Sequence, residues 1–133
     1  MLEGLGELLG SMIVILYVLT ILNFFVKFIF KNYRKQLSKY PEVLKIYTII
    51  MKLIVKNHKL FGLLTILFII AHFLLQFSQY GLNIVGTIAA GAMTMQIMHG
   101  IYGSKMKKRS KIWLISHRTL AAVLLIAIAI HTA

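Results

Sequence analysis

Aspartate and cysteine are absent from this chain, and its only acidic side chains are those of Glu3, Glu7 and Glu42. Hydrolysis by a pair of carboxylates needs two facing acids, and a calcium site needs a cage of oxygen ligands, so the scarcity of acids excludes both. Without cysteine the chain has no disulfide, no thiolate metal site and no thiol nucleophile. The five histidines are therefore the one reactive type of side chain that is present in number.

Charged residues of any kind are scarce. They make up 14% of the chain, against about a quarter in a soluble domain, whereas 59% of the residues are hydrophobic. The apolar residues form four runs, each near the roughly 20 residues that cross a bilayer. The first run lacks a basic leader and a small-residue cleavage site, so we expect an anchor helix and not a signal peptide. We predict an all-α, four-helix transmembrane bundle in a single membrane domain, 1–133, with spans at about 8–30, 58–80, 82–102 and 111–133.

The segment of residues 41–56, before the second span, has a different pattern. It begins with Pro41, which suits the first turn of a helix. Its lysines, and the one just after it, recur at intervals of seven, four and three, which places them on one helical face: Lys45, Lys52, Lys56 and Lys59. This pattern predicts an interfacial amphipathic helix. A plain cytosolic helix and a continuation of the second span are the alternatives.

The basic residues indicate the orientation of the chain. Nine lie in or beside the first loop (27–59) and five in the third (105–111), whereas the second loop, around Gly81, has none. The positive-inside rule then predicts a multi-pass protein of the cell membrane with both termini outside. Because the net charge of +12 is explained in this way, we expect no nucleic-acid partner.

Four of the histidines form two pairs with the same spacing. His58 and His72 lie fourteen residues apart on the second span, as do His117 and His131 on the fourth. Fourteen steps of about 100° end about 40° short of four turns, so each pair lies on one face, about 21 Å apart along the helix axis. Since both helices run from inside to outside, we predict an inner level and an outer level with two imidazoles each.

Two facing imidazoles suit a haem, whose iron takes one axial ligand on each side. We therefore predict two b-type haems, the inner one held by His58 and His117 and the outer one by His72 and His131. Zinc fits less well, because a tetrahedral site wants three or four protein ligands. The alternative is that these histidines only bond to neighbouring groups, but intramembrane ionisable residues are costly and usually functional.

The inner histidines have similar neighbours. A basic residue follows each of them, Lys59 or Arg118, and a small residue, Gly62 or Ala121, lies four positions on. The small residues would let a porphyrin approach the backbone, and the basic ones would pair with its propionates. Snorkelling of the basic residues to lipid phosphate is the alternative. For His99 we expect bonding to water or to Gln96, with a role as haem ligand, proton site or quinone site as the alternative.

Two phrases carry a resemblance to a known family. HKLFGLLTILFIIAH (58–72) and SHRTLAAVLLIAIAIH (116–131) resemble the ferric-reductase-like transmembrane domain shared with NADPH oxidases, one of the di-haem membrane cytochromes b. The resemblance implies that the four paired histidines are the haem ligands. It also implies that electrons pass from a cytosolic flavin domain through the inner haem to the outer one. This chain is too short to hold that domain and has no visible Gly-rich nucleotide loop.

The expected function is transmembrane electron transfer from a separate cytosolic donor to an extracytoplasmic acceptor. An acidic flavoprotein, flavodoxin or ferredoxin would suit the basic face, and membrane lipid is the alternative partner of that face. The other candidate functions are a quinol-oxidising or ferric-reducing cytochrome b subunit and a haem-free membrane transporter or assembly factor.

Overall fold

The computed structural model describes all 133 residues. Four helices follow one another along the chain: α1 (Leu2–Leu37), α2 (Pro41–Tyr80), α3 (Ile84–Lys105) and α4 (Lys111–Thr132). Each of them is long and apolar enough to cross a membrane. The predicted all-α architecture with four spans is therefore confirmed, and the chain is a multi-pass membrane protein.

The helix boundaries follow from local chemistry. Pro41 opens α2, where its missing N–H is not needed. Gly81 ends the same helix with φ at 77°, a backbone conformation that favours glycine. The side chain of Asn83 then caps α3 by accepting from the Gly86 N–H at 2.9 Å, and Ser110 caps α4 by accepting from the Trp113 N–H at 3.1 Å.

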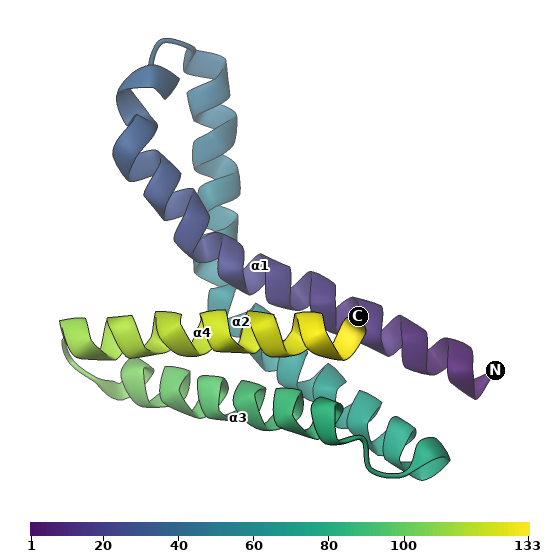
Figure 1. The fold of residues 1–133 in the computed structure, drawn as a ribbon. Helices are drawn as coiled ribbons and strands as arrows, with labels where there is room; N and C mark the ends of the chain where they lie inside the picture. Colours follow the sequence, from purple (N-terminus) through teal and green to yellow (C-terminus); the bar gives the residue numbers. More distant parts are fainter.

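The four helices form an L (Figure 1). In one limb, the bundle, α3 and α4 lie side by side with the first part of α1 and the second part of α2. The Tyr17 hydroxyl of α1 donates to the Ala121 carbonyl of α4 there. In the other limb the second part of α1 packs on the first part of α2, where the Tyr47 hydroxyl donates to the Val26 carbonyl. We call this second limb, residues 26–57, the arm.

The predicted interfacial helix, about residues 41–56, is not a separate element. It is continuous with the second span, because α2 runs unbroken from Pro41 to Tyr80. The physical reason is that residues 42–61 contain neither glycine nor proline, so nothing interrupts the helical hydrogen bonds. The predicted first span, about residues 8–30, is likewise part of a longer helix, because α1 runs from Leu2 past Val26 into the arm and ends at Leu37.

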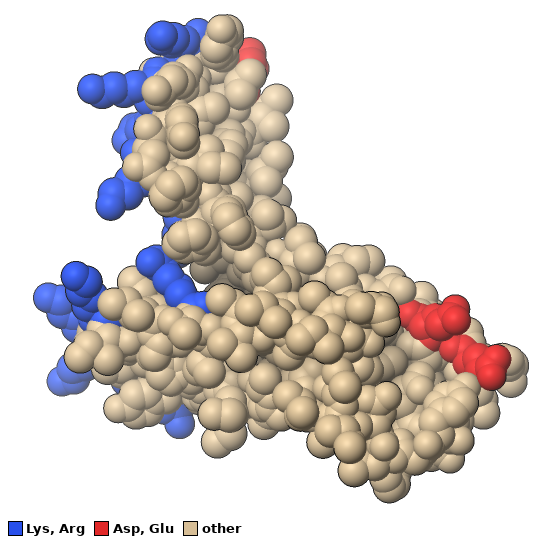
Figure 2. Space-filling view, in the orientation of Figure 1, with Lys and Arg blue, Asp and Glu red and all other residues tan.

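The surface of the bundle is apolar, whereas its charges are segregated. Only 12 of the 133 residues are buried, and many large apolar side chains point outward, as lipid-facing side chains do. Basic side chains gather along one side of the arm and at one end of the bundle, while acidic side chains lie at the opposite end of the bundle and at the tip of the arm (Figure 2). Glu3 lies in the first turn of α1 and accepts a hydrogen bond from the Tyr80 hydroxyl at 3.2 Å.

Candidate functional site

The structure brings the histidines together in the expected pairs. The rings of His58 and His117 have their centres 6.4 Å apart, with an angle of 76° between the ring planes. The rings of His72 and His131 also have their centres 6.4 Å apart, at 81°. Each pair joins α2 to α4, and the two pairs form two levels of the bundle.

The ring spacing fits one metal ion between each pair. A metal–imidazole bond is about 2.0 to 2.1 Å long, and a ring nitrogen lies roughly 1.1 Å from the ring centre. Two imidazoles on opposite sides of one metal therefore have their centres about 6.3 Å apart. Both pairs match this value within about 0.1 Å.

Helix α1 orients the two histidines of α2. The Nδ1 atom of His58 lies 3.2 Å from the Thr20 carbonyl oxygen, and that of His72 lies 3.1 Å from the Gly6 carbonyl oxygen. A carbonyl only accepts, so Nδ1 carries the proton and Nε2 keeps its lone pair for a metal. Thr20 and Gly6 are themselves fourteen residues apart.

The inner histidine of α4 has a different environment. The Nδ1 atom of His117 is buried and has no hydrogen-bond partner. Its Nε2 atom lies 3.5 Å from the side-chain nitrogen of Gln96, which donates to the His117 carbonyl at 3.0 Å. A buried imidazole with a free nitrogen is costly unless something binds that nitrogen, which is consistent with a ligand at this level.

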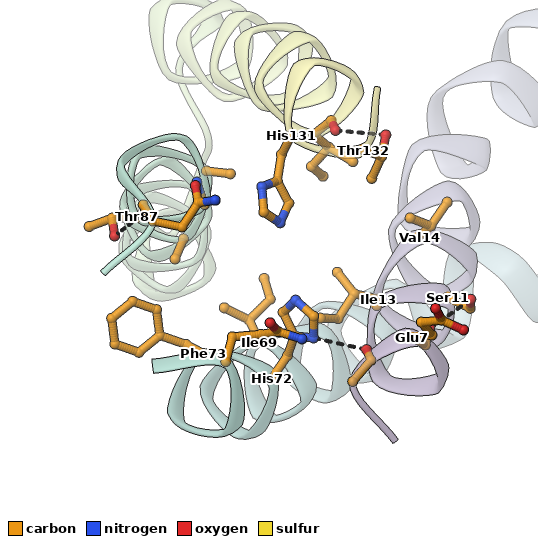
Figure 3. A pocket seen from close by; sticks show the side chains of 18 of the residues that line it. Glu7, Ser11, Ile13, Val14, Ile69, His72, Phe73, Thr87, His131 and Thr132 are labelled. Atoms are coloured by element: carbon orange, nitrogen blue, oxygen red, sulfur yellow. Dashed lines mark hydrogen bonds between the residues drawn. The ribbon is translucent and has the colours of Figure 1, made fainter. Parts of the chain in front are cut away.

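A separate cavity opens at each level. The outer one has a volume of about 830 Å³, and His72 and His131 point toward one another across it (Figure 3). The inner one has a volume of about 240 Å³ and is lined by His58, His117 and Trp113. The outer volume is typical of a site for a cofactor-sized ligand, and the inner one is smaller than usual.

Glycines make room for three of the histidines. A Cβ atom added at Gly86 would lie 2.9 Å from Cε1 of His131, closer than real contacts allow. Added at Gly100 or Gly10, it would lie 3.6 Å from Cε1 of His117 or His72. This clearance for the rings is not predicted from the sequence, although Gly86 and Gly100 carry the same fourteen-residue spacing as the histidines.

The predicted flanking residues divide into two groups. Lys59, Gly62 and Ala121 line the inner cavity, although a Cβ on Gly62 would meet nothing within 4 Å. Arg118 does not line it, because its guanidinium lies 4.8 Å from the ring centre of Phe24. The arginine that does line it is Arg109, which the sequence analysis did not single out as a site residue.

His99 belongs to an aromatic stack beside the inner pair. Its ring is nearly parallel to those of Trp113 and His117, with centres 5.5 and 6.0 Å away. Its Nε2 atom lies 2.8 Å from the Ser116 hydroxyl oxygen. Of the two expected partners of His99, water and Gln96, the bond to Gln96 is not formed, because the His99 Nε2 atom faces Ser116 and the Gln96 side-chain nitrogen donates to the His117 carbonyl.

Comparison of the chain with protein-family models, with curated proteins and with solved structures finds no match. The resemblance to the ferric-reductase-like domain therefore depends on the spacing and surroundings of the histidines alone.

Proposed function

We propose that the chain is a membrane cytochrome that holds two b-type haems and carries electrons from one face of the membrane to the other. One observation carries the proposal. Both histidine pairs place their ring centres 6.4 Å apart, a separation that fits two imidazole ligands of one metal. The donor set at each level supports haem over zinc, because no group of three or more His, Asp or Glu side chains is assembled.

A bound haem would supply reversible one-electron chemistry. His58 and His117 would hold the inner group, and His72 and His131 the outer group. The carbonyls of Thr20 and Gly6 fix the ring orientation of the α2 histidines. Lys59 and Arg109, at the wall of the inner cavity, provide positive charge for propionates. A haem held by the two imidazoles of one level would favour electron transfer over binding of oxygen.

The charge distribution supports a direction and a partner. We place the protein in the cell membrane with both termini outside, so that the inner level lies near the cytoplasm. The basic end of the bundle and the basic side of the arm would face the cytosol (Figure 2). An acidic donor, such as a flavoprotein, flavodoxin or ferredoxin, would be attracted there. Anionic lipid would compete for the same charges.

Absorption spectra of the purified protein, oxidised and reduced, test the cofactor. We expect about two haems per chain, because each level has two imidazole ligands. His131→Ala should remove the outer haem and leave the inner one. Thr132→Ala, which also alters the lining of the outer cavity, is the matched control and should keep both. A colourless parent protein from haem-replete cells would overturn the proposal.

Oriented vesicles test the transfer itself. A reductant on the basic side should reduce an impermeant ferric acceptor on the other side, and His72→Ala should abolish this reduction. The inner haem of that variant should still be reduced from the basic side. Transfer at the parental rate in both His72→Ala and His131→Ala would show that electrons do not pass through the outer pair.

A further inference from the structure

A layer of four side chains separates the two cavities. Thr65 and Leu124 are both 0% exposed, Met93 is 2% exposed and Tyr17 is 3% exposed, the lowest values among the residues other than glycine. Each of the four helices contributes one of these residues. We call these four residues the septum.

The helical register places Thr65 and Leu124 midway between the levels. Thr65 is seven residues from both His58 and His72, and Leu124 is seven residues from both His117 and His131. Seven residues are two helical turns, so these two side chains lie on the same helix faces as the histidines and about 10.5 Å from each level. Tyr17 lies nearer the inner level, because it is only three residues from Thr20, whose carbonyl faces His58.

The septum lies between the two cavities. Leu124 lines the outer cavity, whereas Tyr17 and Met93 line the inner one. These three residues also form the buried cluster of the apolar core. The two cavities are therefore separated by the packing of Leu124 with Tyr17 and Met93.

The septum offers water no free hydrogen-bond donor. The Tyr17 hydroxyl donates to the Ala121 carbonyl, and the Thr65 hydroxyl donates to the Phe61 carbonyl at 2.7 Å. A buried water needs two to four polar partners, and apolar cavities stay dry. The outer cavity, in contrast, is lined by polar side chains that include Glu7, Ser11 and Gln76.

We infer that the septum of Tyr17, Thr65, Met93 and Leu124 is a barrier to water and protons, so that each level exchanges protons only with the solution on its own side of the membrane. This inference goes beyond the proposed function and does not need a bound haem. Where haem is bound, it means that electrons cross the bundle without protons following them through the protein.

A proton-leak assay tests the barrier. The purified full chain is reconstituted in vesicles that contain a pH-sensitive dye, and the external pH is stepped while valinomycin and potassium hold the membrane potential at zero. Leu124→Ser removes a septum side chain and adds a hydroxyl that can hold water. We expect its proton flux to rise severalfold over the parent. Leu125→Ser is the matched control, because Leu125 is exposed on the same helix, and its flux should equal the parental flux.

Leu124→Ala serves as a second variant if the serine does not insert. It opens the same space without a polar group, so its flux should lie between those of the parent and Leu124→Ser. A parental flux in an inserted, helical variant overturns the barrier.

Haem is counted in the same preparations, which separates the two proposals. A colourless parent with a septum-dependent flux overturns the proposed haem function only, and a parent with two haems and an unchanged flux in the variants overturns the septum only.

Discussion

The inner and outer cavities differ in size, about 240 Å³ against about 830 Å³, although the ring centres of both histidine pairs are 6.4 Å apart. The cause lies in the residues beside each pair. A shift of fourteen residues maps Trp113 onto Ala127, and in the other direction it maps His99 onto Val85. The inner level is thus filled by an indole and a third imidazole where the outer level has small or aliphatic side chains.

The two levels also differ in charge. Lys59 and Arg109 line the inner cavity, and Glu7 lines the outer one. The repeated spacing thus provides both levels with facing histidines and glycines, whereas non-repeated residues determine volume and charge. The following predictions test this difference between the levels.

The test of which level faces the cytoplasm has the largest expected effect, because a cysteine on one side of the membrane either reacts with an impermeant reagent or does not. In a chain without native cysteine, a single cysteine at Leu82, the exposed residue beside Gly81, should react with an impermeant maleimide added outside intact cells, and one at Lys107 should not. Lysis should make the cysteine at position 107 reactive, which serves as the control. The reverse pattern would exchange the two levels and the direction of electron flow.

The glycines should respond unequally. Gly86→Ala places a Cβ 2.9 Å from His131, so the ring must move out of its position facing His72. Gly100→Ala makes only an ordinary contact, 3.6 Å from His117. We expect the first variant to lose most of the outer haem and the second to keep the inner haem, measured as haem per chain. Equal losses in both variants would show that clearance at the ring edge does not decide binding.

Trp113 should matter for the inner level alone. Its ring stacks on His117 with centres 4.9 Å apart, and its Nε1 donates to the His99 carbonyl at 3.1 Å. Trp113→Ala should destabilise the chain by about 3 to 5 kcal/mol, as removal of a buried aromatic ring does. Thermal unfolding measures this loss, and Trp113→Phe should recover much of it. A change in the spectrum of the outer haem would contradict the separation of the levels.

The basic loop should give the smallest effect. Replacement of Lys107 and Lys108 by glutamate should slow reduction of the inner haem by an acidic donor severalfold and flatten its dependence on salt. The same exchange at Lys45 and Lys52 tests the arm in a matched way. Insertion is checked by the labelling pattern. An unchanged rate and salt dependence in both double variants would assign these charges to lipid.

The sequence predicts the spans and the pairs because both depend on one-dimensional spacing. Apolar runs of bilayer length predict the helices, and the fourteen-residue spacing predicts which histidines share a level. The arm is not predicted, because the lysine pattern of residues 41–56 is the same whether or not the helix breaks before His58. The contact between Arg118 and Phe24 is not predicted for a related reason. The sequence fixes the position of Arg118 along α4, but the direction of its side chain depends on how α4 packs against Phe24, which no local pattern encodes.

The unbroken course of α2 makes the arm a lever. Tyr47 contacts α1 within the arm, and His58 lies further along the same helix, within the bundle. No glycine or proline between them can absorb a bend. A thinner bilayer or a bound protein that tilts the arm would therefore also shift His58, the first residue of α2 after the arm. His72 lies about four helical turns further from the arm along the same helix.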